Sequence, residues 1–373
     1  MRLKKATIFM LIQLLMMSFL AGTVVYGLET QVEEEEKTLT YTYEELLEIA
    51  KKNSKELKKK AQEIERSELV RKEVADQKNY TPTGIGTGEA ADLQERSILQ
   101  GLVSADIGLQ MKKKQVEIEE DRLAYNLKKA FNKLVLSKSQ LQLDENAKEI
   151  SQLELNLANV QHNNGAIGRF ELTQRQKSYQ ETEKKLDASK ISLESAYLEL
   201  NNLTGLDKSL RYNLEVEEKE EKELSSLEHH VNRVLLNNPS IWTLEQNVRL
   251  SELAVTLHSY NAGQDPYNAK KIDVSTAKLD LGNAKETLEY SLRTLYHSME
   301  QLKEAKNILE INLEKAKESL EMTELKLELG MAVPLETKKI QNTVTELEHQ
   351  LLDNSLKYEE TLAVYQKPWV AGN

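Results

Sequence analysis

The chain has 373 residues with a formal net charge of −11, and 30% of them are charged. Gly and Pro together contribute roughly 5% of the residues, against about 12% in an average chain, so we expect a mostly helical protein. Zero Cys excludes disulfide scaffolds, zinc–thiolate sites and thiol catalysis, and a pI near 5.3 argues against nucleic-acid binding.

Residues 1–27 predict a signal peptide. Arg2, Lys4 and Lys5 precede an apolar stretch from Ala6 to Ala21, and small residues before position 28 suit a cleavage site. The alternative is an uncleaved N-terminal anchor, because the apolar stretch is nearly long enough to span a membrane. Residues 28–41 follow as an acidic leader.

Residues 42–205 predict a first helical repeat. Thr42, with Glu45 in the capping-box position, should begin a helix that runs to about residue 77. A second helix is expected from about residue 102 to 163 and a third from about 169 to 203, with Gly-rich breaks between them. The charged segment 206–224 then reads as a linker.

Residues 225–366 predict a second repeat, and 367–373 a tail. When the two repeats are aligned, Asn237 falls on Asn53, and similar neighbours surround both. Gly330 likewise falls on Gly165, and the two segments that precede these glycines also match. Several matches in chain order predict a tandem duplication.

Helix lengths and leucine spacing suggest how the helices pack. A helix of about 60 residues reaches about 90 Å, so two helices of about 35 residues must lie end to end beside it. The last long helix has leucines at heptad spacing with one shift of four, which is typical of a nearly straight coiled coil: Leu288, Leu295, Leu302, Leu309, Leu313, Leu320 and Leu327. We therefore predict an all-α fold of long antiparallel coiled-coil helices in two tandem three-helix repeats. An ordinary intramolecular bundle is the alternative.

The opening helix from Glu44 to Asn53, its echo near Asn237 and Pro239, and the turn motif Gly165-x4-Phe170-Glu171 resemble the TolC-like outer-membrane efflux proteins. The resemblance covers nearly all of the chain after the signal peptide. It implies a protomer of an α-helical trunk, a homotrimer, and partners in the form of an adaptor (membrane fusion) protein and an inner-membrane transporter.

The sequence departs from that family in two connectors. In the family, each connector between the first and second helix of a repeat supplies two membrane strands, and a spanning strand needs about 9 to 11 residues. Residues 261–270 are too few for two strands, and residues 78–101 lack alternating apolar side chains. We therefore expect the barrel strands to be missing, which leaves an outer-membrane location open.

The turns after the long helices hold the candidate site. The glycines suit a left-handed helix end, and apolar side chains on exposed turns indicate a docking surface. By resemblance these turns are tips that dock an adaptor, and the candidate residues are Gly165, Ala166, Ile167, Phe170, Gly330, Met331, Ala332, Val333 and Leu335.

Glu171 and Glu336 occupy the same place after the two turn glycines. The resemblance implies an acidic constriction at the channel entrance, where three copies would attract cations. The alternative is an exposed glutamate that interacts favourably with the helix dipole.

No catalytic, cofactor-binding or metal-binding residues are predicted. The six histidines have no metal-binding spacing, and we expect His229 and His230 to be a solvated pair. No group of residues predicts an enzyme. The leading hypothesis is an exported efflux or export conduit component of the cell envelope. The alternative is an exported coiled-coil scaffold, derived from the same family, without channel activity.

Overall fold

The computed structural model describes residues 39–79, 89–216, 226–258 and 265–371, and these residues form an all-α fold. The signal peptide, most of the acidic leader and residues 217–224 of the linker lie outside the described residues. The elements are β1 (Thr40–Tyr41), α2 (Tyr43–Asn53), α3 (Lys55–Asn79), α4 (Glu89–Asn163), α5 (Arg169–Thr204), β2 (Asn213–Leu214), α6 (Leu227–Asn237), α7 (Pro239–Thr256), α8 (Tyr267–Glu328), α9 (Pro334–Gln366) and the 3₁₀ turn η1 (Pro368–Val370).

The predicted helix start at Thr42 is confirmed. The Thr42 hydroxyl accepts a hydrogen bond from the Glu45 amide at 3.3 Å, and the Glu45 carboxylate accepts one from the Thr42 amide at 2.9 Å. This reciprocal capping box satisfies two backbone donors at the start of α2. The same segment carries β1, which pairs in parallel with β2 and so fixes the entry to α2 beside the exit from α5.

The first predicted helix is not continuous, which corrects the expected single helix over 42–77. The backbone of Ser54 leaves the helical region at φ −56° and ψ 117°, and its hydroxyl accepts a hydrogen bond from the Leu57 amide at 3.2 Å. Ser54 therefore ends α2 and caps α3. Asn238 does the same between α6 and α7, where Pro239 occupies the first helical position.

The second helix begins earlier than predicted. The sequence placed residues 78–101 in a connector and began the second helix at about residue 102, but α4 starts at Glu89 and contains Gly101. A Cβ at Gly101 would lie 3.6 Å from the Val74 side chain of α3. Gly101 therefore lies inside α4, close to the Val74 side chain of α3.

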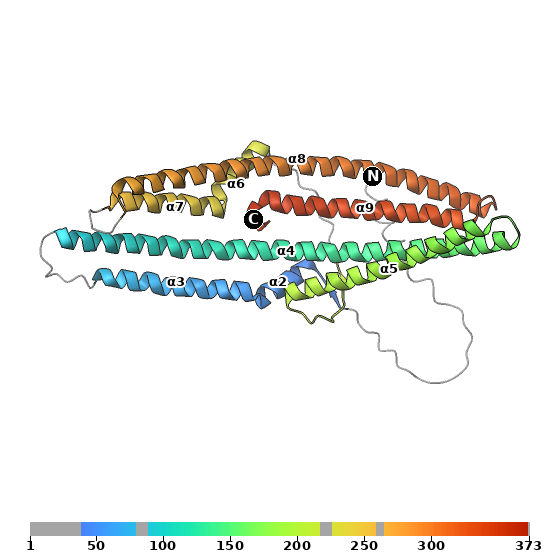
Figure 1. Ribbon diagram of the computed structural model, residues 1–373, viewed down its shortest axis with the longest axis horizontal. Coiled ribbons are helices and arrows are strands. Elements are labelled where there is room, and N and C mark those ends of the chain that lie inside the picture. Colours follow the sequence, from blue (N-terminus) through green and yellow to red (C-terminus); the bar gives the residue numbers. More distant parts are fainter. Residues whose placement is uncertain (1–38, 80–88, 217–225, 259–264, 372–373) are drawn as a thin grey trace, which may run out of the picture. The chain divides into compact units, whose positions relative to one another are not determined.

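The helices pack in a fixed order, which Figure 1 shows. Helix α4 packs on α3 and α5, which follow each other along its length, and α8 packs on α7 and α9 in the same manner. Helices α7 and α9 also contact α4. The order is therefore α3 with α5, then α4, then α7 with α9, then α8. Helices α3 and α5 thus form one edge of this order, and α8 forms the other.

Two apolar cores lie at the same level of the two halves. The first joins α2, α4 and α5 and contains Leu46, Ala50, Leu127, Phe131, Leu134, Tyr197, Leu200 and Tyr212. The second joins α6, α8 and α9 and contains Val231, Val234, Leu292, Met299 and Tyr365. All seven leucines of the predicted coiled-coil seam of α8 are partly buried. Burial of these side chains supplies most of the driving force for folding.

The contact between the two halves is more polar than these cores. On the α4 and α9 faces, Asn132 donates a hydrogen bond to Glu360 at 3.1 Å, and Lys128 pairs with Glu359 at 2.9 Å. Within the described segments, no helix is both long and apolar enough to span a membrane.

Candidate functional site

The turn between α4 and α5 ends the first long helix with a left-handed glycine. Gly165 has φ +74°, its amide donates to the His162 carbonyl at 2.9 Å, and the Ala166 amide donates to the Gln161 carbonyl at 2.8 Å. These two bonds satisfy carbonyls that the helix end would leave free. The His162 ring and the Ile167 carbonyl lie 3.0 Å apart and close the turn.

The turn between α8 and α9 has the same geometry. Gly330 has φ +72°, its amide donates to the Leu327 carbonyl at 3.0 Å, and the Met331 amide donates to the Lys326 carbonyl at 2.7 Å. Pro334 begins α9 with its ring at the first helical position, where no amide proton is needed. Both predicted turns therefore form with the same backbone solution.

Apolar side chains are exposed at both turns, although not all are those expected. Phe170 is 78% exposed, Met331 74% and Val333 60%, while Ile167 and Ala332 are half-buried. Ala166 is exposed, and Leu335 is half-buried at the start of α9. The exposed apolar surface thus lies on larger side chains than the sequence suggested.

The helices that lead into the turns extend this apolar surface, which sequence reasoning missed. Leu153, Leu157 and Val160 are exposed apolar residues of α4; Met322 and Leu325 of α8 and Leu329, which directly follows α8, are exposed as well. Their helical spacing places each set on one side of its helix. That spacing was visible in the sequence, but it does not reveal which side remains uncovered.

Ion pairs join the two helical hairpins near the turns. Glu154 of α4 pairs with Arg175 of α5 at 3.1 Å and with Lys339 of α9, and Glu149 of α4 pairs with Lys338 of α9. The Glu154 carboxylate is the least exposed of these side chains, at 19%. One carboxylate therefore holds three helices together.

Glu171 and Glu336 are exposed and lie in the first turns of α5 and α9. A carboxylate in that place interacts favourably with the helix dipole.

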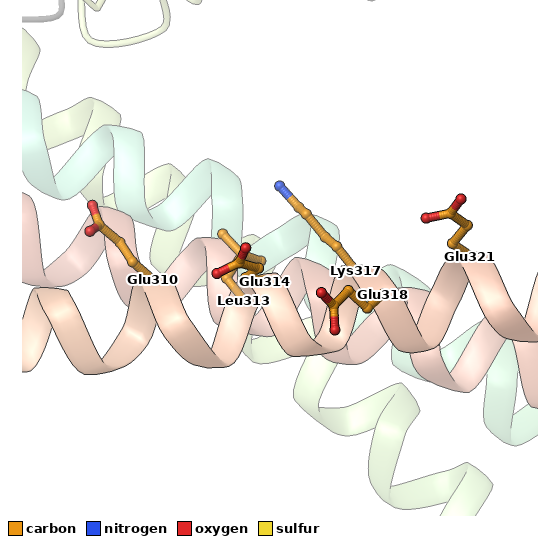
Figure 2. Close-up of a pocket in the computed structure, with 6 residues that line it drawn as sticks. All are labelled: Glu310, Leu313, Glu314, Lys317, Glu318 and Glu321. Carbon is orange, nitrogen blue, oxygen red and sulfur yellow. The ribbon is translucent and has the colours of Figure 1, made fainter.

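A shallow acidic groove lies farther along α8. Figure 2 shows Lys317 and several carboxylates extending from that helix. The groove is lined by Glu310, Leu313, Glu314, Lys317, Glu318 and Glu321. The Lys317 amine pairs with Glu348 of α9 at 2.9 Å. Helix α8 thus has an acidic side next to the side that packs on α9.

Two histidines make polar contacts within the fold. His349 lies 2.8 Å from the Ser139 hydroxyl, and His162 closes the first turn. The expectation of a solvated pair is wrong for His230, which is 2% exposed, whereas His229 is exposed. In the segments that the structure describes, no three His, Asp or Glu side chains are grouped so that they could hold a metal ion.

No protein-family model matches the sequence, and no curated protein matches it. Solved structures do match. The Campylobacter jejuni outer-membrane channel CmeC aligns with a TM-score of 0.63 at 12% identity over 88% of this chain and 86% of its own. The Vibrio cholerae outer-membrane protein VceC gives 0.63 at 11% identity over 89% and 96%. The transmembrane-channel protein CusC gives 0.62 at 13% identity over 89% and 92%.

The chain has the TolC-like fold of these outer-membrane channels. The similarity covers 88% to 89% of this chain and 86% to 96% of the three solved structures.

Proposed function

We propose that this chain is one protomer of an exported TolC-like conduit of the cell envelope. One observation carries the proposal: the fold of outer-membrane channels is matched over 88% of the chain in two solved structures, while the sequence offers no catalytic constellation. The adaptor and the inner-membrane transporter are the partners of the conduit in this proposal.

The exposed side of α8 supports a homotrimer. Ile272, Leu279, Tyr290 and Ile308 are all exposed, and successive members are separated by close to whole numbers of helical turns. They form an apolar stripe along the edge of the packing order. A stripe of this length in water favours a partner surface.

The other edge of the same copy can cover this stripe. Helices α3 and α5 expose Leu69, Ile191 and Leu198. When one edge of a copy binds the other edge of the next copy, the same contact can repeat around a rotation axis. If the last copy meets the first, the copies form a closed ring. Three copies of this chain would complete such a ring and enclose a channel.

The two cores support the proposed duplication. In the alignment that places Gly330 on Gly165, Leu292 falls on Leu127 and Met299 on Leu134, and these four core side chains are buried. Corresponding positions of the two predicted repeats thus pack in corresponding places.

The opening helices of the two repeats agree with this. In the alignment that places Asn237 on Asn53, Val234 falls on Ala50, and both of these side chains are buried. Helices α2 and α6 therefore present equivalent positions to the cores of their own halves.

The turns are the proposed adaptor-docking tips. Phe170 and Met331 expose large apolar surfaces beside the left-handed glycines, and Glu171 and Glu336 follow them on α5 and α9. An adaptor hairpin that covers these side chains would remove their apolar surface from water. The glutamates would then lie at the channel entrance.

Sedimentation equilibrium and electron microscopy of the mature protein test the trimer. The native protein should sediment as a trimer and give ring-shaped projections. Ile308→Glu places a charge on the α8 stripe and should give folded monomers, because an unpaired charge in an apolar contact costs several kcal/mol. Leu99→Glu is the matched control, since α4 lies inside the packing order. A native monomer would reject the conduit.

Pull-down with the adaptor protein tests the tips. Met331→Glu should reduce adaptor capture tenfold or more, which corresponds to about 1.4 kcal/mol, without lowering the melting temperature. Leu335→Ala is the comparison, because its half-buried side chain should affect stability instead. Unchanged capture by Met331→Glu, from a protein that still trimerises, would favour the exported scaffold.

A further inference from the structure

A buried histidine lies at the joint between α6 and α9, at a position where the first half has a leucine. His230 is 2% exposed and aligns with Leu46 of the first repeat, which is 0% exposed. Tyr365 aligns with Leu200, which is also fully buried. A histidine and a tyrosine thus replace two core leucines in the second half.

Both ring nitrogens of His230 have hydrogen-bond partners. The Arg233 guanidinium, 2.9 Å from Nδ1, can only donate, so Nδ1 accepts. The Nε2–H then donates to the Tyr365 carbonyl at 2.8 Å. The His230 ring also stacks on the Tyr365 ring, with centroids 3.9 Å apart and planes 16° apart. The surroundings therefore hold a neutral imidazole in one tautomer.

A second proton on His230 has no acceptor. It would bind at Nδ1, break the bond from Arg233 and place two cations in contact. Burial lowers the pKa of His230; the bond to the Tyr365 carbonyl opposes this, and the charges of Arg233 and His229 lower the pKa further.

The charged side chains on the neighbouring elements are paired with other groups, so they do not stabilise a positive charge on His230. Helix α9 presents Tyr365, and α8 presents Tyr296 together with Arg293, whose guanidinium is bound by Glu228 and Glu289. The carboxylates of α7, Glu245 and Glu252, bind Lys285 and Lys278 of α8.

The joint holds the end of α9, from which the C-terminal segment crosses to the first half. Tyr365 lies in the last turn of α9, and η1 follows it directly. Lys367 binds Asp121 of α4 at 2.6 Å, and the Trp369 indole N–H donates to the same carboxylate at 2.8 Å. Val370 is buried beside them. Loosening at His230 would therefore reach the contact between α9 and α4.

We propose that His230 is a proton-sensitive clasp, whose protonation in mildly acidic surroundings loosens the end of α9 and releases the C-terminal segment from α4. The clasp acts within one chain, so it does not depend on the proposed conduit.

The sign of the effect follows from the lowered pKa. Above the ordinary histidine pKa of 6.5, the ring is neutral whether the joint is closed or open, and the joint has its full stability. As pH falls below 6.5, the open form binds the proton first and is increasingly favoured. The stability of the closed joint stops falling once the pH is below the pKa that His230 has in that joint.

Hydrogen exchange of the full mature protein tests the clasp. Exchange is measured at about pH 5 and about pH 7.5, on either side of the histidine pKa, and corrected for the intrinsic rate. Backbone amides of residues 361–371 should exchange several-fold faster in acid. Amides of residues 196–204, at the corresponding end of α5, should change little.

Two variants separate His230 from general acid effects. His230→Leu, which restores the residue type of Leu46, should remove the acid effect, whereas His229→Leu should keep it because that side chain is exposed. If His230→Leu fails to fold, Arg233→Gln decides, since removing the opposing cation should reduce the acid effect. The clasp would be overturned if acid accelerated exchange of residues 361–371 in His230→Leu as much as in the native protein. Where Arg233→Gln decides instead, the same result in that variant would overturn it. Equal acceleration at 196–204 would also overturn it.

Discussion

Lys339 near the start of α9 forms an ion pair with Glu154 of α4, and this contact ties the second hairpin to the first close to the turns. Glu154 also holds Arg175 of α5 at 3.1 Å. Because the Glu154 side chain is only 19% exposed, water screens these pairs less than it screens a fully exposed pair. The Glu149 side chain, which pairs with Lys338, is 58% exposed.

Replacing Glu154 with Gln should loosen the turn ends of both hairpins. The change leaves Arg175 and Lys339 without their common partner, and we expect a loss of about 1 kcal/mol in stability, near the upper range for exposed pairs. Thermal melts and hydrogen exchange of residues 150–175 and 325–345 measure it. Glu149→Gln is the control and should cost less; a larger loss there would contradict the role of Glu154.

Replacing Gly330 or Gly282 with alanine should change stability in opposite directions. Gly330 needs φ +72°, so alanine there strains the backbone and should cost about 1 kcal/mol. Gly282 lies within α8 and has open space around its Cβ position, so alanine there should stabilise by about 0.5 to 1 kcal/mol. Urea unfolding of Gly330→Ala and Gly282→Ala gives both values. A Gly330→Ala variant as stable as the native protein would show that the turn does not require the left-handed conformation.

The turns could be predicted from the sequence because they depend on local chemistry. Gly165 and Gly330 follow long helical patterns, and a left-handed helix end needs little beyond glycine there. The helical fold was equally predictable, since few residues interrupt helices and the leucine seam of α8 has a regular spacing. The capping box at Thr42 formed for the same local reason.

The remaining features depend on contacts between distant residues or on small backbone choices. The break at Ser54 has no proline to signal it, and the sequence does not reveal that α4 extends back to Glu89. The Glu154 pairs join residues far apart in the chain. The burial of His230 depends on Tyr365 from another helix, so its sequence neighbour His229 gave a misleading impression.

Tyr43 provides a test in alkaline solution. Its hydroxyl donates to the Ala124 carbonyl of α4 at 2.9 Å, and burial, with a smaller contribution from Glu44, raises its pKa to about 12. The unfolded chain loses this proton near pH 10, as an ordinary tyrosine does. Between about pH 10 and about pH 12 the folded state therefore binds the extra proton, and stability falls as pH rises through that range.

Tyr43→Phe should reduce this alkaline loss, while costing about 1 kcal/mol at neutral pH through the missing hydrogen bond. Part of the loss should remain, because burial also raises the pKa of Tyr212. Urea midpoints at about pH 8 and about pH 11 measure both effects, on either side of the ordinary tyrosine pKa. Tyr267→Phe is the matched control, since that side chain is exposed at the start of α8 and lies outside the core of α2 and α4. If Tyr43→Phe loses as much stability between the two pH values as the native protein, the Tyr43 hydroxyl is not held by the core of α2 and α4.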